Sequence, residues 1–205
     1  MNTGKKELNS ILDELDVLKL PHMAAELQTQ FRKPDFLNTG RLELIGALVH
    51  AEYAVTMENR YAARLKKAKL KGGSCTPYLA KALGAEACRD FRTAYYHCDE
   101  LAGDLAIVRR TDYPKYKKKL RALVNLDLLI LDDFLLHSIT EDNEVKVLYD
   151  ILERRNEISR SCIICTQREP KAWPSMLMED EVSSNSILKR VTKHYNVIVQ
   201  RKVID

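Results

Sequence analysis

Long apolar runs are absent from this chain of 205 residues. No run approaches the ~18 residues that a membrane-spanning helix needs. Residues 2–7, Asn-Thr-Gly-Lys-Lys-Glu, lack the apolar stretch of a secretory signal peptide. The sequence has no internal repeat and no low-complexity segment. Apolar residues nevertheless make up 45% of the chain, so we expect a globular protein of the cytoplasm with a packed core.

Cysteine is scarce, with five residues scattered along the chain. Cys162 and Cys165 have CxxC spacing, but they fall in an apolar segment that predicts a strand. Residues three apart on a strand point to opposite faces, so this pair cannot share a metal ion or form a disulfide without a bend. We interpret all five as reduced thiols that mostly fill the core.

Positive charge is concentrated in two segments, although the net charge is only +4. Residues 60–71 contain no acidic residue, and residues 109–121 contain one, Asp112. Such clusters predict an anionic partner, and ordinary solvated helix faces are the alternative. The candidate DNA-binding residues in these clusters are Lys66, Lys67, Lys117 and Lys118.

Apolar spacing divides the chain into two regions. Residues 1–71 are predicted to be helical, because apolar residues recur at helical spacing with breaks at Pro21 and near Pro34. Residues 72–205 alternate helices with apolar strands, which predicts an α/β domain whose parallel sheet is covered on both faces. The predicted strands cover residues 93–98, 127–133, 161–167 and 196–203. The predicted helices cover residues 77–89, 99–110, 115–123, 141–156 and 183–194.

Residues 127–133, Asp-Leu-Leu-Ile-Leu-Asp-Asp, predict a buried strand with two carboxylates at its carboxyl end. Open α/β sheets bind their ligands at that edge. Asp132 is the candidate Mg²⁺ ligand, and Asp133 is the candidate residue that orients or deprotonates an attacking water. The alternative is an Asp pair that only caps a turn.

Two further polar residues are candidates for the same site. Thr166 ends the next predicted strand, where a hydroxyl could sense a terminal phosphate or position the water. Arg190 lies on the predicted helix 183–194 and could reach the nucleotide of a neighbouring subunit. Polar residues end most strands and arginines are common on surfaces, so neither position alone predicts a function.

The order of these segments resembles the IstB-like transposition helper ATPases, relatives of the DnaC-type helicase loaders within the AAA+ class. Residues 18–24 read Leu-Lys-Leu-Pro-His-Met-Ala, and residues 127–134 read Asp-Leu-Leu-Ile-Leu-Asp-Asp-Phe. The other matching segments are residues 64–70, 78–84, 87–89, 163–167 and 187–191, with the region of Trp173. The resemblance covers nearly the whole length in the order of the family.

The resemblance implies a P-loop NTPase-like fold, with ATP and Mg²⁺ as cofactors and with DNA and a transposase as partners. It places Asp132 at the Mg²⁺-associated aspartate and Asp133 at the acidic position beside it. Thr166 would fall at the sensor position and Arg190 at the inter-subunit arginine of a homo-oligomer. The helical region, residues 1–71, would contribute partner and DNA contacts.

The chain departs from the family at the phosphate-binding loop, the Walker A motif. Family members have a first sheet strand and then a Gly-rich loop that ends in Gly-Lys-Thr or Gly-Lys-Ser. Here residues 72–77 read Gly-Gly-Ser-Cys-Thr-Pro, so Thr76 takes the place of the lysine and Pro77 that of the hydroxyl residue. The first strand and most of the loop are missing from the sequence, which predicts an incomplete or remodelled sheet.

The remaining candidates for nucleotide contact in this segment are Gly73, Ser74 and Thr76. Such loops act through converging backbone N–H groups, a lysine on the phosphates and a hydroxyl on Mg²⁺. Pro77 has no N–H, and Thr76 carries no charge. We therefore expect weak or absent ATP hydrolysis. Two alternatives remain open: a non-enzymatic DNA- or transposase-binding module, and an inactive remnant of a mobile element.

Overall fold

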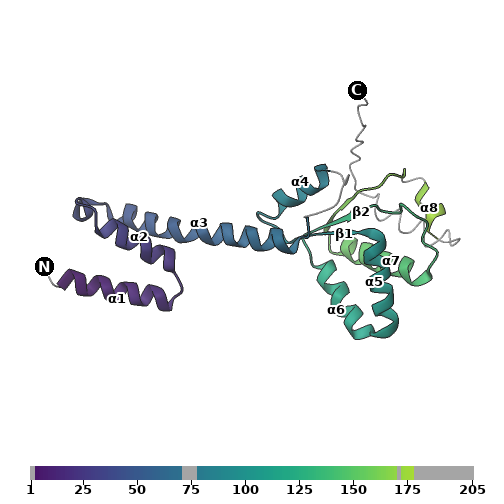
Figure 1. Ribbon diagram of the computed structural model, residues 1–205, viewed down its shortest axis with the longest axis horizontal. Coiled ribbons are helices and arrows are strands. Elements are labelled where there is room, and N and C mark those ends of the chain that lie inside the picture. Colours follow the sequence, from purple (N-terminus) through teal and green to yellow (C-terminus); the bar gives the residue numbers. More distant parts are fainter. Residues whose placement is uncertain (1–2, 71–77, 170–171, 178–205) are drawn as a thin grey trace, which may run out of the picture. The chain divides into compact units, whose positions relative to one another are not determined.

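The computed structural model describes residues 3–70, 78–169 and 172–177 (Figure 1). They belong to two units, residues 1–63 and residues 64–205. The predicted helix 183–194 and strand 196–203 lie outside the described residues. No helix in the described part of the chain is long and apolar enough to cross a membrane.

The first unit is helical, as the apolar spacing predicts. It contains α1 (Thr3–Val17), α2 (Pro21–Phe31), the 3-10 turn η1 (Phe36–Asn38) and α3 (Arg41–Lys67) as far as Ala63. Pro21 occupies the first turn of α2, where a missing N–H costs nothing. Glu52 of α3 caps that turn, because its Oε2 accepts hydrogen bonds from the backbone N–H of His22 (2.9 Å) and Met23 (3.0 Å).

Among the described residues of the second unit, three strands form a parallel sheet. The strands β1 (Thr93–His97), β2 (Leu128–Asp132) and β3 (Ser161–Ile164) lie in the order β1-β2-β3. The acidic strand β2 is therefore the middle strand, and Leu129, Ile130 and Leu131 are fully buried. This arrangement confirms the predicted α/β parallel fold with a helical N-terminal region.

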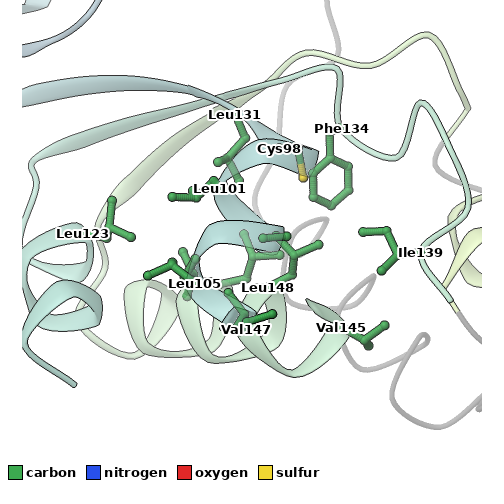
Figure 2. Close-up of a cluster of buried hydrophobic side chains, with 14 of the residues drawn as sticks. Cys98, Leu101, Leu105, Leu123, Leu131, Phe134, Ile139, Val145, Val147 and Leu148 are labelled. Atoms are coloured by element: carbon green, nitrogen blue, oxygen red, sulfur yellow. The ribbon is translucent and has the colours of Figure 1, made fainter. Parts of the chain in front are cut away.

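Three of the described helices pack on one face of the sheet: α5 (Cys98–Thr111), α6 (Tyr113–Val124) and α7 (Asp142–Glu157). Figure 2 shows part of the core that they form, in which Leu101, Leu131 and Leu148 are buried. The short α8 (Trp173–Met176) adds Trp173, whose ring meets that of Phe134 edge-on at 5.0 Å. The buried faces of these helices explain the apolar spacing in the sequence.

The other face is covered by α4 (Tyr78–Ala87), which brings Ala80 against Tyr95 and Ile130. Gly84 lets this helix approach closely, because a Cβ there would stand 2.6 Å from Ile130 Cδ1. The chain just after α3 also contacts the outer edge of β1, where Tyr95 N–H donates to the Ala68 carbonyl (2.9 Å). Both faces of the sheet are thus covered, as predicted.

Candidate functional site

The two carboxylates of the acidic motif lie at the carboxyl end of the middle strand, in different environments. Asp132 is the last residue of β2 and is 1% exposed. Asp133 leaves the strand with φ of 50°, a left-handed conformation that Asp adopts more readily than most residues, and its side chain is 40% exposed. One carboxylate is therefore buried and the other is partly exposed to solvent.

The neighbouring strand β1 supplies two aromatic residues to this site. Tyr95 and His97 are two positions apart and share a face, with their rings edge-on at 5.5 Å. The Tyr95 hydroxyl donates a short hydrogen bond to Asp132 Oδ2. His97 is the register partner of Asp132. The buried carboxylate is thus held in place by a phenol.

His97 completes a group of possible metal ligands with the two aspartates. Its Nδ1 lies 3.5 Å from Asp133 Oδ2, and one ligand atom each from His97, Asp132 and Asp133 lie within 4.8 Å of one another. The carboxylates fit Mg²⁺, which takes oxygen ligands, whereas an imidazole nitrogen suits transition metals better. The residues present therefore fit a divalent cation, with one ligand more than the sequence indicates.

Cys165 lies just beyond the end of β3, on the side of the sheet covered by α4, and borders the acidic pair. Burial, the negative charges of Asp132 and Asp133, and a hydrogen bond to Asp132 raise the pKa of the Cys165 thiol to about 12. The thiol is therefore protonated at neutral pH. It adds no charge to the site.

Asp99, near the start of α5, adds a third carboxylate nearby. Burial raises its pKa, and the charge of Asp133 raises it further, whereas His137 and His97 lower it. Its Oδ1 is buried and makes no hydrogen bond to any described residue. The surroundings of the acidic pair are therefore rich in negative charge and imidazole.

The predicted sensor residue, Thr166, lies beside the acidic loop. Its hydroxyl donates to the Phe134 carbonyl (2.8 Å) and accepts from the Arg168 N–H (3.1 Å). The structure thus brings Thr166 beside Phe134, the residue after Asp133, and its hydroxyl fixes the loop there. The other predicted site residues, Gly73, Ser74, Thr76 and Arg190, lie outside the described residues.

Three site residues escaped the analysis of the sequence: Tyr95, His97 and Lys81. Tyr95 and His97 alternate along an aromatic strand, a pattern that gains meaning only when the strand is placed beside Asp132. Lys81 lies on α4, and its Nζ lies over the Tyr95 ring, 5.3 Å from the centroid. A lysine is therefore near the phenol that holds Asp132.

The candidate DNA-binding lysines lie on two helices. Lys66 and Lys67 are exposed at the end of α3, and Lys118 is exposed on α6. Lys117, also on α6, is half-buried with its Nζ over the Tyr113 ring. None of these four takes part in the ion pairs found among the described residues. Their charges are available to an anionic partner.

Two comparisons with known proteins bear on this site. Residues 71–202 match a family described as IstB-like ATP binding protein. Over an alignment 208 residues long, the chain is 28% identical to a protein of Sinorhizobium fredii (strain NBRC 101917 / NGR234) provisionally named insertion sequence ATP-binding protein y4pL. That alignment covers 81% of this chain and 83% of the relative. The family match spans more than half of the chain and confirms the resemblance seen in the sequence: this chain belongs to the family of IstB-like ATP binding proteins.

Proposed function

We propose that this chain is an ATP-binding helper of DNA transposition whose ATP hydrolysis is impaired. The observation that carries this proposal is the buried Asp132 beside the accessible Asp133 at the carboxyl end of the middle strand. That edge is where α/β sheets hold nucleotides. Family membership supplies the nucleotide, ATP, and the relative's name supplies the association with insertion sequences.

Each residue has a role in this proposal. Asp132 holds the Mg²⁺ that accompanies ATP, directly or through water, and Asp133 orients the attacking water. Bound Mg²⁺ supplies charge neutralisation at the phosphates. Thr166 fixes the loop that carries Asp133, through its bond to the Phe134 carbonyl. Arg190 reaches the nucleotide of a neighbouring copy in a homo-oligomer.

Impaired hydrolysis follows from the phosphate-binding segment of this chain. Residues 72–77 contain no lysine for the phosphates, which leaves Gly73, Ser74 and Thr76 as the loop's possible contacts. Without that lysine, the binding of the nucleotide's phosphates is weaker.

Steady-state phosphate release tests the impaired hydrolysis. We expect turnover well below the ~1 s⁻¹ at the lower end of ordinary enzymes. Asp132→Asn serves as the control, because any hydrolysis that survives this change comes from a contaminant. Turnover of about 1 s⁻¹ or more that Asp132→Asn abolishes would contradict the proposal.

We also propose that DNA binds through the two lysine clusters and that a transposase is the protein partner. The exposed side chains of Lys66, Lys67 and Lys118, together with Lys117, favour contact with phosphate. Changing all four to Ala should weaken DNA retention. It should also make the slope of log K against log salt concentration shallower by up to about 3.6, since each phosphate contact contributes about 0.9 to that slope. The matched control changes four exposed lysines elsewhere: Lys6, Lys19, Lys33 and Lys146.

The same DNA measurement separates the alternative functions. Retention that the four substitutions weaken, and that ATP does not change, favours the non-enzymatic binding module. Retention that neither the four substitutions nor ATP changes would contradict the DNA role of these lysines. Non-cooperative unfolding of the purified chain would favour the inactive remnant.

A further inference from the structure

His97, Asp132 and Asp133 form a ligand set that differs from the one predicted for a nucleotide-bound Mg²⁺. It adds an imidazole nitrogen to two carboxylates, and all three residues come from the ends of adjacent strands. We propose that these three residues bind a divalent transition-metal ion of the Zn²⁺ class directly, without nucleotide. The site would therefore exist whether or not the chain binds ATP.

The distances agree with a shared ion. Two ligands about 2.1 Å from a tetrahedral Zn²⁺ are about 3.4 Å apart. The His97 Nδ1 to Asp133 Oδ2 separation is 3.5 Å. Asp132 contributes a ligand atom within 4.8 Å of both. The open side of Asp133, 40% exposed, leaves room for a water as the fourth ligand.

The site is also organised in advance by its neighbours. Asp132 is 1% exposed, and the Tyr95 hydroxyl fixes the orientation of its carboxylate. Hydrogen bonds of this kind to metal-ligating carboxylates raise metal affinity. The His97 ring is held edge-on against Tyr95 at 5.5 Å. One phenol therefore supports two of the three ligands.

The charges favour a dication. Asp132 and Asp133 place two carboxylates at one strand end, and Asp132 is buried. A bound cation would offset the cost of holding these acidic groups close together and away from water.

When no nucleotide is present to supply phosphate oxygens, the ligand types favour a transition metal over Mg²⁺. Mg²⁺ requires six ligands, almost always oxygen, and gives up its waters reluctantly. Imidazole suits Zn²⁺ and the later first-row metals, and affinity for mixed nitrogen and oxygen sites rises along that series. His97 is therefore the residue that determines metal specificity.

Titration of the full chain with Co²⁺ in the absence of nucleotide tests this site, because Co²⁺ replaces Zn²⁺ and reports its ligands by visible absorption. We expect saturable binding that about 10 mM Mg²⁺ does not displace, since Mg²⁺ binds such sites far more weakly. His97→Ala should weaken Co²⁺ binding at least about tenfold, because even changes outside the first shell of ligands cost that much. Asp133→Asn should weaken it as well.

The matched control is His50→Ala, which removes an exposed histidine from α3 and should leave Co²⁺ binding unchanged. Far-UV circular dichroism confirms that each variant folds. Three results would overturn the proposal: equal affinity in the wild type and His97→Ala, complete displacement by Mg²⁺, or a thiolate-to-cobalt charge-transfer band. The last would identify a cysteine such as Cys165 as the ligand.

Discussion

Replacing Arg155 with Met should destabilise the second unit strongly while leaving the acidic carboxyl end of β2 intact. Arg155 lies on α7, is 1% exposed, and forms no ion pair with any described carboxylate. Its guanidinium instead donates to four backbone carbonyls. These are Leu123 (2.7 Å), Val124 (3.1 Å), Leu126 (2.8 Å) and Ser161 (2.6 Å). It therefore joins the end of α6 to the starts of β2 and β3.

The expected magnitude follows from these bonds. The hydrogen bonds to Leu123 and Val124 are buried, and a buried acceptor that loses its donor costs about 1–3 kcal/mol. Water can replace the two partly buried bonds at lower cost. Two buried losses give about 2–6 kcal/mol, and we expect about 4 kcal/mol because Met restores some apolar packing. This is a large fraction of the ~5–15 kcal/mol stability of a typical domain.

Urea unfolding measures this loss through the fluorescence of Trp173, the chain's single tryptophan, which is 4% exposed. With a slope near 2 kcal/mol per M, about 4 kcal/mol lowers the midpoint by about 2 M. The matched control is Arg154→Met on the preceding residue, which should change stability by less than about 0.5 kcal/mol. A midpoint shift below about 0.5 M for Arg155→Met would refute the reasoning.

Three further changes have defined outcomes. Hydrogen bonds from Arg92 lower the pKa of Asp127, so Asp127→Asn should cost about 1–2 kcal/mol at pH 7. Because that pKa lies below 3.8, the wild type should be more stable than Asp127→Asn above pH 3.8. This extra stability should be lost as the pH falls further, and acid unfolding of both proteins measures the loss. Gly84→Ala should lower the thermal midpoint despite better helix propensity, because its Cβ would meet Ile130 Cδ1 at 2.6 Å; an unchanged or higher midpoint contradicts this packing. Glu52→Gln removes the charge at the start of α2 and should cost about 0.3–1 kcal/mol; equal stability in low salt would count against the cap.

Much of the fold is predictable from the sequence, because its signals are local. The spacing of apolar residues places α1, α2 and α3, and the continuous apolar run of 127–133 places the middle strand. Each signal depends on residues a few positions apart, since each element buries one face or both. The structure ends β2 at Asp132, one residue before the predicted end, because Asp133 turns into a left-handed conformation.

The site is only partly predictable, because its contacts are not local. Asp132 and Asp133 follow from the motif alone, whereas Tyr95 and His97 become site residues only through the pairing of β1 with β2. The side-chain position of Lys81 depends in the same way on how α4 packs on the sheet. Long-range register, which no local pattern specifies, therefore limits the prediction of this site.

The affinity for ATP with Mg²⁺ tests the central claim most directly, namely that the acidic edge persists while the phosphate-binding loop has lost its lysine. A labelled ATP titration of the full chain, with Mg²⁺ in excess, gives this affinity. We predict no saturation across the low micromolar range, because residues 72–77 provide no phosphate-binding lysine. A Kd in the low micromolar range, lost on Asp132→Asn, would contradict the account.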